Sequence, residues 1–289
     1  MRFWTLWSPP RRAVARVARV GERIAERNLP DHPQPVLFVV GLPKSGTTWL
    51  TQLLEELPRY RRRPFRDPDH CLLNHDVCDA LVEYFPRDLY SVFKTHTQPT
   101  PENIRVIESH GLPAVVMHRD LRDQCVSRYY HVLQDPTHRH HELYEQLPKD
   151  EGMLHSIDAT LEIYVPWVEG WVEHLAHSGH PYKELRYEDL RRDPVPVFRD
   201  VAAFYGIDLS DAEAATIVEH VKARTQFGKL SAGGIATGKS TARKGSIGDW
   251  RNHFGPEHVE RFKRGAGELL IRLGYETDDS WAAAPTVAA

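Results

Sequence analysis

Residues Val36–Leu50 read VLFVVGLPKSGTTWL, and this stretch decides which fold the chain can form. Five apolar residues run into Gly41, and Gly46 follows at the spacing that a nucleotide-phosphate loop requires. Such a loop carries its lysine directly after the second glycine, where this chain has Thr47. Its lysine, Lys44, lies inside the loop instead. The displaced lysine indicates a phosphate chemistry that differs from that of the P-loop nucleotidases.

The context of this loop is that of a working anion site, because an apolar strand precedes it and a helix follows. Consecutive amides near Gly46, Thr47 and Thr48 should face an anion, helped by the helix dipole. Lys44 adds charge, and the threonines add hydroxyl donors. The alternative is a capped turn that binds nothing, which a loop this rich in donors makes the weaker interpretation.

Length and composition limit the class of protein. The chain has 289 residues, 41% of them hydrophobic, which suits one large α/β domain or at most two small ones. A formal net charge of −3 does not indicate a bulk attraction to nucleic acid or membrane. Three scattered cysteines, Cys71, Cys78 and Cys125, form no disulfide framework and fit a reducing, cytoplasmic setting. No apolar run approaches the roughly 18 residues of a membrane helix.

Residues 1–34 form an Arg-rich, amphipathic segment without the apolar core of a signal peptide. The favoured interpretation is a surface helix packed on the domain. The alternative is peripheral contact with anionic lipid, with Trp4 and Trp7 as anchors.

Periodicity predicts one α/β domain over residues 35–276, with a mainly parallel central sheet flanked by helices and a P-loop-like phosphate-binding loop. The residues after it, 277–289, are expected to be a loose tail. Ligands of such sheets bind at the carboxyl ends of the strands. Strands are expected at 35–40, 88–96, 113–120 and 182–190, and helices at 47–57, 121–133, 155–175 with a break near Pro166, 194–206, 210–223 and 255–275.

Three other motifs suggest chemistry that their contexts do not support. Residues 233–240, GGIATGKS, match the phosphate-loop pattern, but no strand precedes them, so a flexible lid is favoured. The HRDL at 118–121 resembles a kinase catalytic loop, yet Cys125 stands where that loop needs asparagine. The HRHHE near His138 suggests a metal site, but the spacing is loose and a solvated loop is preferred.

Several motifs together resemble one known family. PKSGTTWL at 43–50 is similar to the 5′-phosphosulfate loop of the cytosolic-type sulfotransferases, which use 3′-phosphoadenosine-5′-phosphosulfate (PAPS). HRDLRDQCVSRYY is similar to their 3′-phosphate strand and helix, RKGSIGDWRNHF at 243–254 to their C-terminal signature, and FKTH at 93–96 to the segment with their catalytic histidine. RYEDL and TQF resemble segments that approach the adenine. The motifs occur in the family's order over roughly residues 35–255.

The resemblance implies a set of site residues and no metal. The implied catalytic residues are His96, Lys44, Lys94 and Ser127. The implied nucleotide-binding residues are Lys44, Ser45, Gly46, Thr47, Thr48, Trp49, Arg119, Ser127, Tyr187, Thr225, Phe227, Arg243, Lys244 and Gly245, with Trp49 and Phe227 placed to enclose the adenine.

Elementary chemistry agrees with these roles. A lysine inside the loop can meet the bridging oxygen as the S–O bond breaks, which stabilises charge that develops in the transition state. An acceptor hydroxyl needs a base near neutral pH, and His96 ends a predicted strand at the ligand edge beside Lys94. His118 also ends a strand, but is expected to be structural. The rate is expected to rise through an apparent pKa in the histidine range.

Two departures from the family pattern are informative. Thr97 and Gln98 replace the Leu-Pro that usually follows the histidine, so the acceptor loop differs from that of the phenol and steroid enzymes. Gly255 and Pro256 replace the Thr-Val of the usual dimer segment, which puts that dimer in doubt. The acceptor is expected to be a hydroxyl or amine of a small molecule, lipid or sugar, and not a nucleic acid. The alternatives are a small-molecule kinase with an atypical loop and a non-catalytic nucleotide-binding protein.

Overall fold

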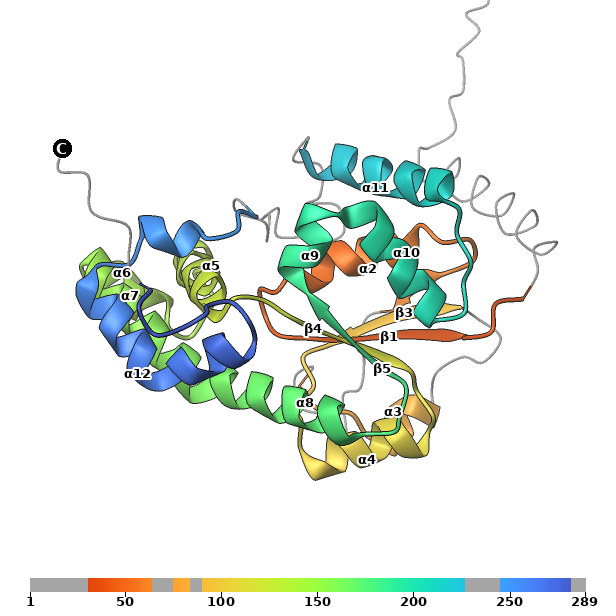
Figure 1. Ribbon diagram of the computed structural model, residues 1–289, viewed down its shortest axis with the longest axis horizontal. Coiled ribbons are helices and arrows are strands. Elements are labelled where there is room, and N and C mark those ends of the chain that lie inside the picture. Colours follow the sequence, from red (N-terminus) through yellow and green to blue (C-terminus); the bar gives the residue numbers. More distant parts are fainter. Residues whose placement is uncertain (1–30, 64–74, 84–89, 227–244, 282–289) are drawn as a thin grey trace, which may run out of the picture.

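The computed structural model describes residues 31–63, 75–83, 90–226 and 245–281. A five-stranded sheet in the order β2-β3-β1-β4-β5 lies at its centre, and every neighbouring pair is parallel (Figure 1). The strands are β1 (Val36–Gly41), β2 (Arg61–Arg63), β3 (Ser91–Thr95), β4 (Ala114–His118) and β5 (Tyr182–Arg186). The predicted fold class is therefore confirmed.

Alternation along the inner strands assigns each side chain to one of two cores. Val36, Phe38 and Val40 of β1 enter one cluster, whereas Leu37 and Val39 enter the other. Successive side chains of a strand point to opposite faces, so a continuous apolar run is what a sheet covered on both faces requires. This is why the apolar stretch before the loop forms a central strand.

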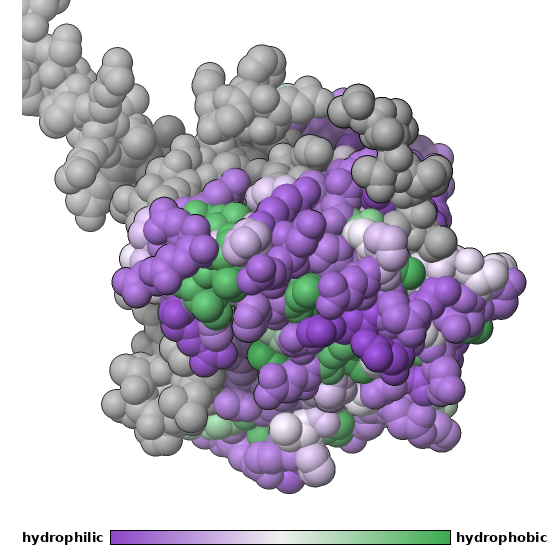
Figure 2. All heavy atoms as spheres, turned by 90° about the vertical axis from the view of Figure 1, so that its left-hand side faces the viewer, coloured by the Kyte–Doolittle hydropathy of each residue, from purple (hydrophilic) through white to green (hydrophobic). Residues whose placement is uncertain are grey.

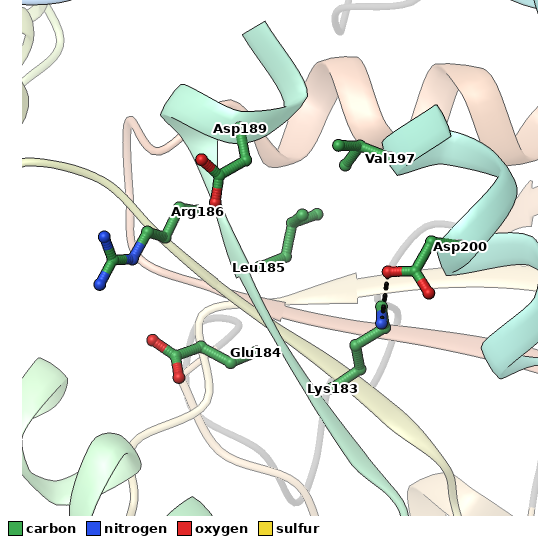
Figure 3. Close-up of a pocket in the computed structure, with 7 residues that line it drawn as sticks. All are labelled: Lys183, Glu184, Leu185, Arg186, Asp189, Val197 and Asp200. Carbon is green, nitrogen blue, oxygen red and sulfur yellow. Dashed lines mark ion pairs between the residues drawn. The ribbon is translucent and has the colours of Figure 1, made fainter. Parts of the chain in front are cut away.

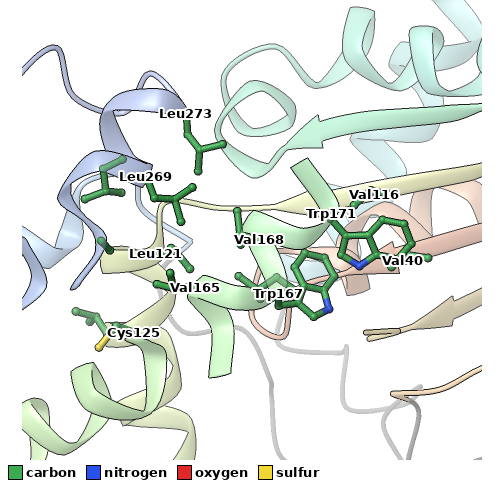
Figure 4. Close-up of a cluster of buried hydrophobic side chains, with 14 of the residues drawn as sticks. Val40, Val116, Leu121, Cys125, Val165, Trp167, Val168, Trp171, Leu269 and Leu273 are labelled. Carbon is green, nitrogen blue, oxygen red and sulfur yellow. The ribbon is translucent and has the colours of Figure 1, made fainter. Parts of the chain in front are cut away.

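Helices cover both faces of the sheet (Figure 1). One core packs against α2 (Thr47–Glu55), α9 (Tyr187–Arg192), α10 (Pro194–Phe204) and α11 (Asp211–Gln226). The other packs against α3 (Asp79–Glu83), α4 (Pro101–Ser109), α5 (Leu121–Gln134), α6 (His141–Gln146), α7 (Lys149–Ala159), α8 (Val165–His177) and α12 (Pro256–Arg272). Figure 4 shows how Trp167 and Trp171 of α8 lie against Val40 and Val116, while Leu269 and Leu273 lie near Leu121.

The predicted interruption between residues 155 and 175 has a definite form. A π-helical turn, η1 (Thr160–Tyr164), separates α7 from α8, and Pro166 follows in the first turn of α8. Proline lacks an N–H and is tolerated there. The predicted cap of α11 is also present, because Ser210 and Glu213 exchange hydrogen bonds.

Four elements, β2, α3, α4 and α6, were not predicted from the sequence. The strand expected at 182–190 is too long, because α9 begins at Tyr187 directly after β5. β2 is a three-residue edge strand of arginines, and no apolar alternation marks it. α4 carries a clear N-terminal signal, since Thr100 accepts a hydrogen bond from the amide of Asn103 and Pro101 follows it. That signal could have been read from the sequence.

The expectation of a loose tail from residue 277 is wrong at Trp281. Its side chain is 7% exposed and belongs to the same core cluster as Trp250. Burial of a large aromatic side chain removes apolar surface from water, and this favours order in the residues that lead to it. The Arg-rich residues up to 30 lie outside the described residues. Among the helices that are described, none is long and apolar enough to cross a bilayer.

Figure 2 shows the side of the molecule that faces left in Figure 1, where α6, α7 and α12 lie. Hydrophilic residues dominate this side, and the hydrophobic ones appear as separate areas between them (Figure 2). Pro256, in the segment that departs from the family's dimer pattern, begins α12.

Candidate active site

The phosphate loop follows β1 and is shaped by two residues with left-handed backbones. Lys44 has a φ of 70°, although it is not glycine, and Gly46 has a φ of 88°. The Ser45 hydroxyl donates to the carbonyl oxygens of Leu42 at 2.7 Å and Met117 at 3.2 Å. Ser45 therefore holds the loop with its hydroxyl hydrogen, and does not direct that hydrogen at a ligand.

The start of α2 is open to an anion. Gly46 is its N-cap and offers no side-chain cap, and no acidic residue lies in the first turn. The amides of Thr47 and Thr48 thus begin a nine-residue helix whose dipole favours negative charge at this end. Gly41 makes the close return of the chain possible, because a Cβ there would lie 1.9 Å from the Thr47 methyl carbon.

His96 follows β3 directly and faces the loop. Val40 of β1 is level with Thr95 of β3, so the next residues, Gly41 and His96, meet at the carboxyl edge of the sheet. The His96 Nδ1 lies 2.5 Å from the Gly41 carbonyl oxygen. A carbonyl only accepts, so Nδ1 carries the hydrogen and Nε2 is the free base nitrogen.

Two tryptophans fix the chain just after His96. The indole nitrogens of Trp167 and Trp171 donate to the Thr97 carbonyl oxygen at 2.9 Å and 3.0 Å. The Thr97 hydroxyl lies 2.7 Å from that of Thr95. Thr97, one of the departures from the family pattern, is fully buried and anchors the histidine.

Burial and neighbouring cations control the protonation of this site. Burial lowers the pKa of His96 to about 3, with further lowering by Lys94, His75 and Lys44, while the Gly41 carbonyl opposes the shift. His96 is therefore neutral at pH 7 in the ligand-free protein. Burial also lowers the pKa of Lys44 to about 8, assisted by Arg119.

Lys94 shares this electrostatic environment. Burial lowers its pKa to about 8, and the charges of Arg62 and Lys44 lower it further. The pKa values of both lysines are thus depressed by burial and by other cations. The positive charges of the two lysines repel one another in this partly buried site, so an anionic ligand that binds between the lysines would be strongly stabilised.

A second cationic region lies beside the loop, at the ends of β4 and β5. His118 is level with Arg186, which brings the next residues, Arg119 and Tyr187, together. The Arg119 guanidinium carbon lies 4.4 Å from the centre of the Tyr187 ring. Its Nη2 donates to the Ser246 carbonyl at 2.7 Å. Arg119 also forms an ion pair with Asp123, at 3.5 Å.

Tyr187 joins the two regions. Its hydroxyl donates to the Gly245 carbonyl at 2.8 Å. A Cβ at Gly46 would lie 2.5 Å from its ring, so the ring packs directly on the phosphate loop. The structure therefore brings Lys44, Gly46, Arg119, Tyr187 and Gly245 into one neighbourhood.

The remaining predicted residues divide into two groups. Thr48, Trp49 and Ser127 are partly exposed, with Trp49 at the start of α2 and Ser127 on α5, two turns after Arg119. The side chain of Thr225 and all of Phe227, Arg243 and Lys244 lie outside what the structure describes. So does the proposed lid at 233–240.

Two further histidines near the site were missed. The His75 ring centre lies 6.1 Å from that of His96. His131 on α5 has a pKa lowered to about 4, first by burial and then by Lys44. Helical spacing could have found His131, because it stands four residues after Ser127 and so on the same face. His75 is distant in sequence and no local pattern marks it.

The HRHHE segment is engaged in local contacts. His140 donates its amide to Nδ1 of His138 at 3.1 Å, and His141 Nδ1 lies 3.0 Å from the Val132 carbonyl oxygen. Within the described ranges, no group of three or more histidine, cysteine or acidic side chains could hold a metal ion.

A hollow of about 290 Å³ lies along β5 and beneath α9 and α10 (Figure 3). Within it Lys183 binds Asp200 at 2.6 Å, and Glu184 contacts His118 at 2.7 Å. It is lined by neither Lys44 nor His96. The phosphate loop, and not this hollow, is therefore the candidate active site.

Comparison with protein families matches residues 34–274 to the sulfotransferase domain. A flavonol 3-sulfotransferase from Flaveria bidentis is 27% identical, over 88% of this chain and 87% of its own. Cytosolic sulfotransferase 5 from Arabidopsis thaliana is 25% identical, over 82% of this chain and 80% of its own. Sulfotransferase 1C2 from Homo sapiens is 25% identical, over 78% and 80%.

The fold is similar to two solved structures. Mouse sulfotransferase SULT7A1, complexed with PAP, matches with a TM-score of 0.60 and 22% identity, over 83% of this chain and 85% of its own. Retinol dehydratase, in complex with androsterone and the inactive cofactor PAP, matches with a TM-score of 0.57 and 21% identity, over 84% and 82%.

Proposed function

This chain belongs to the family of sulfotransferase domains, and from that premise we propose that it transfers a sulfuryl group from PAPS to a hydroxyl or amine of a small-molecule, lipid or sugar acceptor. One observation carries the mechanistic part of the proposal: the Nδ1 of His96 lies against the Gly41 carbonyl at the edge of the phosphate loop. That contact leaves a neutral Nε2 at the place where an acceptor hydroxyl would meet the donor.

The side chains present fit the two anionic ends of PAPS. The Nε of Arg119 is buried and has no hydrogen-bond partner among the described residues. A 3′-phosphate would supply that partner, in the bidentate geometry that guanidinium groups favour. The Lys44 charge and the first amides of α2 would hold the 5′-phosphosulfate. Gly245, and Arg243 and Lys244 beside it in the sequence, would complete the 3′-phosphate site.

PAPS supplies an activated sulfuryl group whose leaving group is a phosphate. The acceptor oxygen forms a bond to sulfur, the S–O bond to the 5′-phosphate breaks, and the acceptor proton passes to His96 Nε2. Lys44 offsets the charge that develops on the departing phosphate oxygen, Lys94 assists beside it, and Ser127 offers its hydroxyl to the 3′-phosphate. Positioning and fixed charge do most of the work, so these residues require no metal ion.

The acceptor and the cellular setting are proposed only as classes. The relative named for flavonols makes a phenolic acceptor the first choice, with aliphatic alcohols next. The relative named cytosolic favours a cytoplasmic protein. Membrane contact through residues 1–30, and an assembly that does not use the family's usual dimer segment, are further expectations. We find no observation that favours a small-molecule kinase.

The test is an acceptor screen with isotope-labelled PAPS, followed by mass spectrometry of the products. We expect a sulfated product and stoichiometric 3′-phosphoadenosine-5′-phosphate (PAP). Lys44→Ala is the matched negative control, because it should weaken both donor binding and transfer. Phosphorylated products from ATP, with no transfer from PAPS, would replace the proposal by the kinase alternative.

A further inference from the structure

Trp281, a buried residue near the C-terminus, contacts the guanidinium group of Arg122, which lies close in sequence to Arg119 of the proposed nucleotide site. The Arg122 guanidinium carbon lies 4.6 Å from the centre of the Trp281 ring and 4.2 Å from that of Trp250. The two indole rings meet edge to face, with centres 5.4 Å apart. Arg122 is thus enclosed by two aromatic side chains, one from the tail and one from η3 (Asp249–Asn252).

The edges of the same guanidinium are held by carboxylates. Arg122 donates from Nε to Asp120 Oδ1 at 3.0 Å and from Nη2 to Oδ2 at 2.7 Å, and Nη1 donates to Glu276. Asp120 is the N-cap of α5 and the direct neighbour of Arg119. A displacement of Arg122 would therefore reach the start of the helix that follows Arg119.

Trp250 connects the same cluster to the segment that contacts Arg119. Asp123 accepts hydrogen bonds from the amides of Gly248 at 2.7 Å and Trp250 at 2.9 Å. It also pairs with Arg119, and Arg119 in turn donates to Ser246 of that segment. The residues that orient Arg119 are thus held by contacts with Trp250, and the rings of Trp250 and Trp281 both pack on Arg122.

We propose that Trp281 is a positioning residue for the 3′-phosphate site. It packs on Arg122 together with Trp250, and this stack fixes Asp120 and the 245–252 segment. Asp120 and that segment in turn hold Arg119 in place. This role rests on the proposed function, because it assigns the 3′-phosphate of PAPS to Arg119. Trp281 does not touch the nucleotide; it acts through Arg122 and Trp250.

The contacts of Trp281 show which part of its side chain this positioning role requires. Within the described residues, the indole nitrogens of Trp250 and Trp281 have no hydrogen-bond partner. Trp281 is therefore held by its aromatic face and by burial. Phenylalanine keeps an aromatic face for Arg122, whereas leucine keeps only apolar volume.

The experiment measures by calorimetry how much the 3′-phosphate contributes to binding, as the ratio of the dissociation constants of AMP and PAP. Trp281→Leu should lower this ratio by up to roughly thirtyfold, because the effect on binding can be no larger than the cation–π contact that is lost. Trp281→Phe should keep it near the wild-type value. A chain that ends after Trp281 should also keep the wild-type ratio. A chain that ends after Ser280 should show a lowered ratio, as Trp281→Leu does.

Two more variants separate positioning from general loss of stability. Val106→Ala damages the same core cluster from α4 and should lower the melting temperature but leave the ratio unchanged. Lys263→Ala should fold normally and lower the ratio slightly, because Lys263 holds the tail by donating to the Asp279 carbonyl at 2.5 Å.

An unchanged ratio in both Trp281→Leu and Lys263→Ala would overturn the positioning role while leaving the sulfotransferase proposal intact. An equal fall in Val106→Ala would overturn it as well, since the effect would then be general. A wild-type ratio near one would overturn the 3′-phosphate site itself, and with it this role.

Discussion

Replacing His96 by alanine tests the centre of the proposed mechanism. The variant removes the imidazole that lies against the Gly41 carbonyl and that we propose as the base for the acceptor. It leaves Lys44, Arg119 and the start of α2 in place, so nucleotide binding should change little. We expect the chemical step to fail and the dissociation constant of PAP to stay within about twofold, which is less than a single neutral hydrogen bond contributes.

The size of the loss follows from the state of the imidazole. Because burial lowers the pKa of His96 to about 3, the imidazole is almost entirely neutral at pH 7 in the free protein. Nearly every molecule therefore presents a free base. A positioned base contributes about 10²–10⁴-fold, which sets the expected fall in transfer rate.

With this pKa, we expect the acidic limb of the free protein to lie below the histidine range expected from the sequence. As pH falls from 7 to 5, kcat/KM should not decline through His96, because the imidazole stays neutral. Bound PAPS brings negative charge, which favours the imidazolium and raises the pKa. The acidic limb of kcat should therefore lie at higher pH than that of kcat/KM.

The assay is single-turnover transfer from PAPS to an aliphatic alcohol, which does not ionise unaided, with PAP binding followed in parallel. His75→Ala is the matched control, because His75 is an exposed histidine whose ring centre lies 6.1 Å from that of His96. Its effect on the rate should be much smaller. Near wild-type transfer to the alcohol by His96→Ala would refute the assignment of the base.

Three further predictions concern the phosphate loop. Lys44→Arg should flatten the fall of kcat/KM above pH 8, because Lys44, with a pKa of about 8, loses its charge as pH rises, whereas arginine does not; an unchanged alkaline limb would contradict this. Gly46→Ala should lower the free energy of unfolding by about 1–3 kcal/mol more than Gly111→Ala does. Both glycines have a positive φ, but only the methyl group at position 46 would contact Tyr187. Equal losses in chemical denaturation would show that the Tyr187 ring moves away at no cost. Transfer from PAPS should persist in excess chelator, and loss of activity that magnesium restores would count against the proposed chemistry.

Much of the fold and part of the site could be predicted because they depend on local patterns. Five apolar residues before Gly41 predicted a central strand, and β1 is buried on both faces. The spacing of Gly41, Lys44 and Gly46 predicted the phosphate loop. The family resemblance, drawn from motifs spread over the chain, is confirmed by the match at residues 34–274.

Other features could not be predicted because they depend on contacts between residues distant in sequence. Ser45 was expected to face the nucleotide, yet its hydroxyl donates to backbone carbonyls, one of them at Met117. His75 was missed because 21 positions separate it from His96. The short arginine strand β2 has no pattern of its own and forms by pairing with β3.

The sequence by itself determined where most strands end, and therefore which residues follow each strand, because periodicity, glycine spacing and helix caps act over a few residues. Tertiary structure alone decided which of those ends meet. The parallel register sets Gly41 opposite His96 and Arg119 beside Tyr187, and burial among cations then lowers the pKa values of His96 and Lys44. The tertiary structure also decided that Trp281, within a segment expected to be loose, packs on Arg122. Register and burial are properties of the whole packed chain, since each depends on the free energy of many distant contacts at once.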